Sequence, residues 1–172
     1  MPDSDPDLVP ELLVGDLDRS LAFWCGPCGF TVRYSRPEEG FAYLVSGGAH
    51  VMLDRIGLTR DWITAPLERP LGRGLNLQIR VADADAIADA LAAAGIELFA
   101  PPETRWYRVG EEEAGVRQVL VTDPDGYLLR FQSPLSRRPV ERAYSVDTLP
   151  ESRGVMPAED AVARSGLLVS TP

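Results

Sequence analysis

The chain has 172 residues, of which 45% are hydrophobic and 25% charged, and its formal net charge is −9. This composition is typical of one folded domain and excludes a wholly disordered chain, while the acidic balance makes nucleic acid a poor partner because phosphate would be repelled. All 17 basic residues are Arg, which excludes Lys-based Schiff-base chemistry, and the single His, His50, excludes sites that need two imidazoles.

Neither a membrane helix nor a secretory signal is expected. No stretch approaches the roughly 18 apolar residues of a membrane helix. Residues 1–7 are acidic and Pro-rich, unlike the basic start and apolar run of a signal peptide, and we interpret them as a disordered lead-in. Two Cys without such a signal indicate free thiols and a cytoplasmic protein.

The first part of the chain predicts a strand, a helix and three further strands. Residues 8–14 are apolar, and Pro10 among them has no amide donor, so this strand should lie at a sheet edge or cross between subunits. Asp16 is a good N-cap for a helix that the Gly and Pro of residues 26–29 must end. The next strands are expected at residues 30–34, 41–45 and 50–54.

After a connection over residues 55–73, the second part repeats this order. A strand at residues 75–81 precedes an Ala-rich helix at 86–94, which Asp83 or Asp85 caps. Further strands are expected at residues 96–99, which Pro101-Pro102 should end, and at 106–109, 116–121 and 127–132. Asp123-Pro124-Asp125-Gly126 is a strong turn signal.

The two parts are recognisable as an internal repeat. Residues 13–18 (LVGDLD) align with residues 80–85 (RVADAD), and a Gly opens the strand that follows each helix. A unit this short cannot bury its sheet alone, so two βαβββ modules should pair around one cleft. We expect an α+β fold with a cleft-shaped mixed sheet and outer helices. Its single domain spans residues 8–133, with module one at 8–54, a linker at 55–73, module two at 74–133 and a loosely ordered tail at 134–172.

These repeats, with Val-x-Asp-x-Asp before each helix and Asp-Pro-Asp-Gly before the last strand, resemble the vicinal-oxygen-chelate superfamily of glyoxalases, extradiol dioxygenases, fosfomycin-resistance enzymes and bleomycin-resistance proteins. The resemblance covers about residues 8–133. Within the superfamily, the chain is most similar to the bleomycin-resistance group, through Val9-Pro10, residues 20–24 (SLAFW), Gly29-Phe30, residues 41–44 (FAYL), Arg117-Gln118 and the Asp-Pro-Asp-Gly turn.

The resemblance also indicates where a metal would be held. Metal-dependent members use four cleft side chains, and the matching positions here are Val9, Met52, Asn76 and Arg130. Divalent ions prefer carboxylates and imidazoles, and Arg130 would place a cation where the ion belongs. A shift of one or two residues could bring in Glu11, His50 or Asp54 without completing a ligand set. We therefore expect no metal and no cofactor.

The same resemblance, with strand alternation, predicts a ligand site in the cleft. Matching bleomycin-resistance proteins use the equivalent of Phe41 against the bithiazole of the drug, and flat side chains suit a planar ligand. The polar candidates could instead form internal salt bridges, such as Arg130 with Glu11, and each aromatic candidate could be a core residue. The predicted ligand-binding residues are Phe41, Trp62, Asn76, Gln78, Trp106, Tyr107, Arg117, Arg130, Glu38 and Glu39.

Residues 24–28 (WCGPC) match the active-site string of thioredoxin. Thioredoxin chemistry needs the first Cys at a helix N-terminus, where the helix dipole lowers the thiol pKa. Here the pair follows a helix, so its position favours the opposite shift. We interpret the segment as a turn with two ordinary thiols.

Two classes of function follow from the resemblance. The first is a non-enzymatic, homodimeric protein that binds and sequesters a cationic, partly aromatic glycopeptide antibiotic of the bleomycin type, with strand exchange around Pro10 and no nucleic-acid or membrane partner. The alternative is a metal-independent or atypical enzyme of the same superfamily, a lyase, isomerase or dioxygenase-like protein, with Glu11 or Asp54 as a base. Turnover of a small molecule would distinguish the enzyme from the binding protein.

Overall fold

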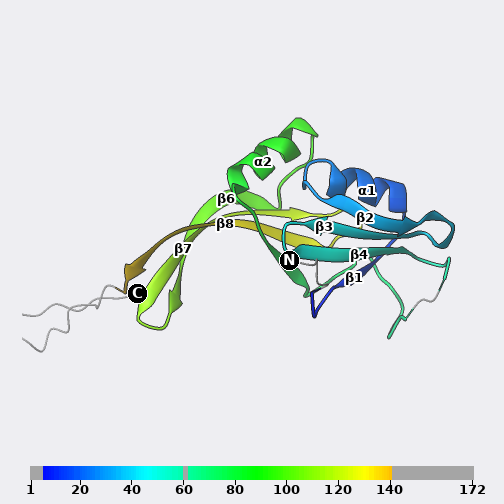
Figure 1. Cartoon of the computed structure of the whole chain (residues 1–172), viewed down its shortest axis with the longest axis horizontal. Helices are drawn as coiled ribbons and strands as arrows, with labels where there is room; N and C mark the ends of the chain where they lie inside the picture. Colours follow the sequence, from blue (N-terminus) through cyan, green and yellow to red (C-terminus); the bar gives the residue numbers. More distant parts are fainter. Residues whose placement is uncertain (1–5, 60–61, 141–172) are drawn as a thin grey trace, which may run out of the picture. The chain divides into compact units, whose positions relative to one another are not determined.

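The computed structural model describes residues 6–59 and 62–140, which contain both repeats (Figure 1). The first repeat consists of β1 (Glu11–Val14), α1 (Leu17–Cys25), β2 (Thr31–Arg36), a single 3-10 turn η1 (Pro37–Glu39), β3 (Phe41–Ser46) and β4 (Ala49–Arg55). The second consists of β5 (Asn76–Arg80), α2 (Ala84–Ala93), β6 (Ala100–Val109), β7 (Glu112–Thr122) and β8 (Leu128–Pro139).

Each repeat of the described chain forms a four-stranded sheet. The first sheet has the strand order β1-β4-β3-β2, and the second sheet has the equivalent order β5-β8-β7-β6. In both sheets the first strand runs parallel to its neighbour, and the other neighbours are antiparallel. The predicted α+β fold of two βαβββ modules is therefore confirmed.

The two helices lie on the same side of the sheets (Figure 1). Asp16 accepts a hydrogen bond from the Arg19 amide at the start of α1, and Asp83 accepts from the amides of Asp85 and Ala86 at the start of α2. Alternate strand residues point toward these helices and join one apolar core, which includes Leu12, Val14, Leu44, Leu53, Val119, Val121, Leu129 and Phe131 with Trp24 and Leu91 of the helices. The remaining strand residues form the face of each sheet that the helices do not cover.

Two buried carboxylates connect the Asp-Pro-Asp-Gly turn to the first repeat. Asp123 Oδ1 accepts from the backbone amides of Asp125, Gly126 and Tyr127, and its Oδ2 lies 3.4 Å from Trp24 Nε1. Asp125 accepts from the Gly15 amide and from Arg69. The turn before β8 is therefore anchored to the beginning of α1, more than 100 residues earlier in the chain.

One predicted strand and its predicted end are wrong. Residues 96–99 are not a strand, although Ile96 and Leu98 pack against the core. Pro101-Pro102, expected to break a strand, lie inside β6 instead. They are tolerated because β6 is the edge of its sheet and its pairing with β7 is irregular between Ala100 and Glu103, where amide donors are not required.

The ends of the domain also differ from expectation. β8 continues to Pro139, six residues past the domain boundary expected at 133. Its last residue still pairs with β7, opposite Glu112. At the other end, β1 begins at Glu11, after Pro10, whose carbonyl accepts from the Met52 amide. β1 is an edge strand and pairs with β4 of its own chain, so exchange between chains stays a prediction. Residues 1–5 of the lead-in expected at 1–7, and residues 141–172 of the tail expected at 134–172, lie outside the described residues.

Replacing Asp123 with Ala should destabilise the fold by about 2–4 kcal/mol, because buried amide donors would lose their acceptor. Asp123→Asn should cost less, since an amide oxygen can still accept from the turn. Burial raises the pKa of the Asp123 carboxyl above its usual value, so the stability that this group contributes is greatest at acid pH and falls as pH rises through the folded-state pKa. Wild type should therefore gain stability relative to Asp123→Asn as pH falls from 7 to 4.

Urea unfolding of the wild type and both variants at the two pH values measures these differences. Asp83→Ala is the matched control, because it removes only an exposed helix cap and should cost about 1 kcal/mol. Equal stabilities of Asp123→Ala and Asp83→Ala would contradict an anchoring role for Asp123.

Candidate ligand-binding site

The uncovered face of the first sheet carries polar and aromatic side chains in two cross-strand rows. Arg36 of β2 lies opposite Phe41 of β3, which lies opposite Asp54 of β4. The next row contains Tyr34, Tyr43, Met52 and Glu11 in the same order. Because side chains alternate along a strand, both rows project from the face opposite the helices. We call this surface the open face of the first sheet.

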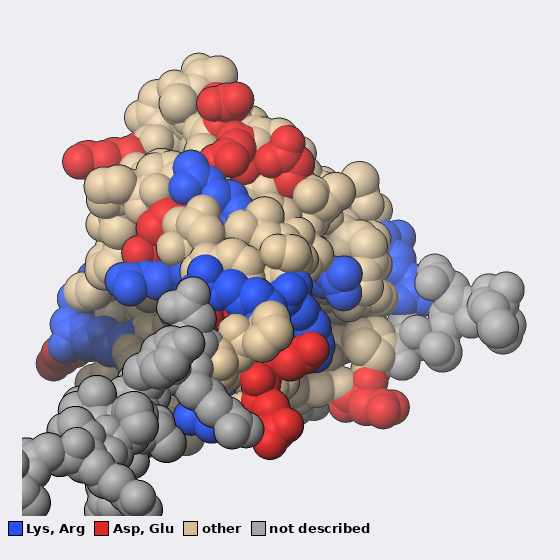
Figure 2. Space-filling view, turned by 90° about the vertical axis from the view of Figure 1, so that its left-hand side faces the viewer, with Lys and Arg blue, Asp and Glu red and all other residues tan. Residues whose placement is uncertain are grey.

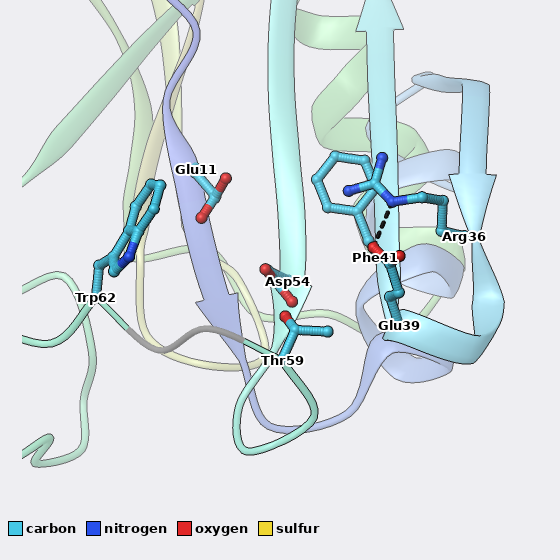
Figure 3. Close-up of a pocket in the computed structure, with 7 residues that line it drawn as sticks. All are labelled: Glu11, Arg36, Glu39, Phe41, Asp54, Thr59 and Trp62. Carbon is cyan, nitrogen blue, oxygen red and sulfur yellow. Dashed lines mark hydrogen bonds and ion pairs between the residues drawn. The ribbon is translucent and has the colours of Figure 1, made fainter.

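A pocket of about 220 Å³ lies over this face (Figure 3). Its lining combines three carboxylates with one guanidinium and two aromatic rings, contributed by Glu11, Arg36, Glu39, Phe41, Asp54, Thr59 and Trp62. Asp54 is buried at the base, whereas Trp62 is 76% exposed and stands across the pocket from Phe41. The excess of carboxylates makes the pocket acidic, which favours a cationic ligand.

The aromatic part of the open face is larger than the pocket lining alone. The Tyr34 and Tyr43 rings are stacked with centroids 5.0 Å apart, and Tyr34 lies 6.0 Å from the Phe41 ring. The Tyr43 hydroxyl and His50 Nδ1 are 2.9 Å apart, which occupies the only imidazole of the chain in a side-chain hydrogen bond. Phe41 and Tyr43 are buried but do not belong to the core cluster beneath the helices.

One cation of the pocket contacts both a carboxylate and an aromatic ring. Arg36 Nε donates to Glu39 Oε2 at 2.5 Å, and the Arg36 guanidinium carbon lies 3.8 Å from the Phe41 ring centroid. The hydrogen bond with Glu39 raises the pKa of the Arg36 guanidinium above its usual value, with smaller contributions from nearby charges. Of the two predicted acidic residues, Glu39 therefore lies at the pocket, whereas Glu38 is exposed and does not line it.

The second sheet presents its own uncovered face with amide and guanidinium groups. Arg130 donates to Gln78 Oε1 on the neighbouring strand, and Asn76 lies two residues before Gln78 on β5. The buried Nε of Arg130 has no hydrogen-bond partner among the described residues. Tyr107 belongs to the same face, because its hydroxyl donates to Gln118, which in turn donates to Glu103. We call this surface the open face of the second sheet.

Two predicted site residues lie on the opposite, helix-side face. Arg117 forms an ion pair with Asp85 of α2 at 2.8 Å, and Trp106 packs over Gly115 beneath the Arg138 guanidinium. A β carbon at Gly115 would come within 2.9 Å of the Trp106 ring, so a side chain at this strand position would displace the ring. Trp106 and Arg117 therefore do not face the same side as Gln78, Tyr107 and Arg130.

The end of the molecule where β7 and β8 extend shows a band of basic side chains with acidic ones on either side (Figure 2). Arg137 and Arg138 of β8 form ion pairs with Glu112 and Glu113 of β7, and Arg105 pairs with Glu103. These arginines are therefore neutralised within the sheet by neighbouring carboxylates.

The positions equivalent to metal ligands do not fit a metal ion. Val9, Met52 and Asn76 offer one oxygen donor between them, and the Arg130 guanidinium already donates to Gln78. In residues 6–59 and 62–140, no three His, Cys, Asp or Glu side chains are grouped so that they could hold an ion.

The two cysteines lie at the C-terminal end of α1. Cys25 is the last residue of that helix, and Cys28 is buried in the core. Burial raises the pKa of the Cys28 thiol to about 12, with further contributions from the negative charges of Asp123 and Cys25, and burial also raises the pKa of Cys25. Both shifts are opposite to those of a reactive thioredoxin-type thiol.

Comparison with known proteins identifies the family. The model of the glyoxalase/bleomycin resistance protein/dioxygenase superfamily matches residues 9–131. TioX from Micromonospora sp. ML1 is 26% identical, and the alignment covers 76% of this chain and 99% of that one with a TM-score of 0.59. A glyoxalase/bleomycin resistance protein/dioxygenase from Nocardioides is 24% identical over 77% of this chain and 86% of that one, with a TM-score of 0.55.

A virulence protein from Salmonella typhimurium shares the fold at 18% identity, with 77% of this chain and 98% of that one covered and a TM-score of 0.56. No curated protein matches the chain. Since the family model covers most of the chain, this protein belongs to the glyoxalase/bleomycin resistance protein/dioxygenase superfamily. The described helices include none long and apolar enough to cross a membrane.

Six residues of the pocket or its wall are not in the list of predicted ligand-binding residues, namely Glu11, Tyr34, Arg36, Tyr43, Asp54 and Thr59. Tyr43 is two residues after Phe41 and shares its face, so strand alternation alone could have identified it. Tyr34 and Arg36 depend on the pairing of β2 with β3, which is irregular between Val32 and Tyr34 and leaves no signal in the sequence.

Both thiols should react slowly with iodoacetamide at pH 8. With a pKa of about 12, Cys28 has a thiolate fraction on the order of one in ten thousand at this pH, and burial further restricts access. Mass spectrometry of the native and the urea-unfolded protein measures the difference, with Cys25→Ser and Cys28→Ser variants assigning each site. Rapid alkylation of either native thiol near pH 6 would contradict the structural role of the pair.

Proposed function

We propose that the open face of the first sheet is one wall of a cleft that binds a cationic, partly aromatic small molecule of the bleomycin type, and that the protein confers resistance by sequestering it. The observation that carries this proposal is the pocket that Glu11, Glu39 and Asp54 line together with the Phe41 ring. Carboxylates attract the cationic part of such a ligand, and an aromatic face stacks against its flat rings. Sequestration of a ligand needs no catalytic group.

The small size of the pocket indicates that a second surface completes the binding site. Sites for drug-sized ligands occupy roughly 300–1,000 Å³, and about 220 Å³ over one sheet is too small. The open face of the second sheet offers complementary groups, because Gln78 and Arg130 carry donors and the buried Nε of Arg130 has no partner among the described residues. We infer that the second sheet of another copy closes the pocket in a homodimer, as the family resemblance suggests.

A second candidate function is catalysis without a metal. Glu11 and Asp54 lie in the same pocket, and Asp54 is buried there, so either carboxylate could accept a proton from a bound substrate. This candidate predicts that a ligand is converted, whereas the binding protein returns its ligand unchanged. Mass spectrometry of bleomycin and of small carbonyl compounds after prolonged incubation distinguishes the two.

Phe41→Ala should weaken the binding of bleomycin by about 2–3 kcal/mol, roughly a hundredfold, because the ring provides both stacking and buried apolar area. Phe41→Leu keeps most of the apolar volume without a flat face and should lose part of this affinity. Titration calorimetry with metal-free and copper-loaded bleomycin measures the change.

Phe99→Ala is the matched control, because Phe99 is 62% exposed and does not line the pocket. Melting temperatures show whether each variant is folded. Unchanged affinity in a folded Phe41→Ala protein would exclude stacking on this ring, and undetectable binding to wild type would exclude bleomycin as the ligand.

The protein should be a dimer at micromolar concentration, because one chain supplies only one wall to each pocket. Multi-angle light scattering measures the mass directly. If the strand that follows Pro10 is exchanged between chains, removal of residues 1–14 should yield a monomer. A wild-type mass equal to that of one chain at these concentrations would contradict the shared cleft.

A further inference from the structure

The accessible side of the Phe41 ring is covered by a side chain of the protein itself. The Arg36 guanidinium lies 3.8 Å from the ring centroid, and its Nε is held by Glu39 (Figure 3). Phe41 is 4% exposed, although it lies outside the core, while the Arg36 side chain above it is 43% exposed. A flat ligand can therefore stack on Phe41 only after the guanidinium moves away.

The residues between Arg36 and Phe41 build this arrangement locally. Pro37 starts the turn η1, which places Glu39 three residues after Arg36 and within reach of its Nε. Gly40 then reverses the chain with φ of +68°, and a β carbon there would approach Arg55 and Leu58 to 2.7 Å. As a result, Phe41 returns directly opposite Arg36 in the register of β2 and β3.

The group that covers the ring has the chemistry expected of a ligand for this pocket. A guanidinium is a planar cation, and here it meets an aromatic face and a carboxylate at once. An amidinium, a guanidinium or a protonated heteroaromatic ring on a small molecule could make both contacts in its place. A neutral or non-planar ligand could reproduce only one of them.

We propose that Arg36 is a specificity-determining residue that occupies the binding position in the free protein, so that the pocket selects ligands whose planar cation replaces the guanidinium between Phe41 and Glu39. This proposal rests on the proposed binding function and specifies its ligand class. Both Arg36 and Glu39 are about half exposed, and solvent-exposed ion pairs and cation–π contacts are weak enough to exchange. Displacement should therefore reduce the affinity of an incoming ligand by about tenfold without preventing binding.

The test uses two fluorescent probes of equal shape on the full chain. p-Aminobenzamidine carries a planar cation, and p-aminobenzamide is its neutral counterpart. Arg36→Ala should bind both probes more tightly than wild type, the cation by about tenfold and the neutral amide by several-fold, because the ring is uncovered for both. Arg55→Ala is the matched control, since it removes one positive charge from the neighbouring strand without uncovering Phe41.

A second variant tests the selectivity. Glu39→Gln removes the carboxylate that a bound ligand cation would contact in place of Arg36. The preference for the cationic over the neutral probe should therefore fall. Melting temperatures establish that each variant is folded. Competition by the unlabelled ligand methylguanidine should release the cationic probe from Arg36→Ala and from wild type alike.

The outcomes separate this inference from the function on which it rests. Equal affinities of wild type and Arg36→Ala for both probes would overturn the role of Arg36 while leaving the pocket as a binding site. If only the cationic probe bound more tightly, and by the same factor in Arg36→Ala and Arg55→Ala, the change in affinity would follow from overall charge. This result would also overturn the role of Arg36. If neither probe bound to any variant and bleomycin did not bind to the wild type, both proposals would be overturned.

Discussion

The structure depends on two buried carboxylates that hold the last turn of the second repeat against the first helix. Asp123 and Asp125 lie at the turn before β8, yet their hydrogen bonds reach Trp24 and Gly15 of the first repeat. Burying a carboxylate is costly unless it is hydrogen-bonded, and these carboxylates accept bonds from backbone amides and from Arg69. They fix the first repeat relative to the start of β8, and the open faces of both sheets depend on that placement.

Because side chains alternate along each strand, one face of each sheet packs in the core and the other is available to bind a ligand. In β4, Val51 and Leu53 join the core, whereas His50, Met52 and Asp54 project from the open face. The side chains on that face are freed from packing under a helix, which allows charged and aromatic groups to gather there. As a consequence, the same fold could bind a different ligand if only the open-face residues changed.

The sequence was sufficient for the fold because the repeat, the helix caps and the turn signals all agree. Asp16, Asp83 and the Asp-Pro-Asp-Gly turn each act through local hydrogen bonds that their residue types predict. The predicted strand bounds were wrong where the position of a strand within its sheet determines which residues it tolerates. Pro101-Pro102 are acceptable in β6 only because it is an edge strand, which no local pattern reveals.

The candidate site could be predicted only in part, for a related reason. Phe41, Trp62 and Glu39 were predicted and line the pocket, but Trp106 and Arg117 face the helices instead. Trp106 and Tyr107 are neighbours on β6, so alternation places them on opposite faces, and only one of them can face the open side. The contact of Arg36 with Phe41 likewise depends on how two strands pair.

The three tryptophans occupy three distinct environments, and this has a consequence for spectroscopy. Trp24 is fully buried and bonded to Asp123, Trp62 stands exposed at the pocket, and Trp106 lies under the Arg138 guanidinium in the second sheet. Their emission should therefore be resolvable into a blue, a red and an intermediate component. A bound ligand would quench the red component first, whereas loss of the core would shift the blue one, so a single emission spectrum can distinguish occupancy of the pocket from unfolding of the chain.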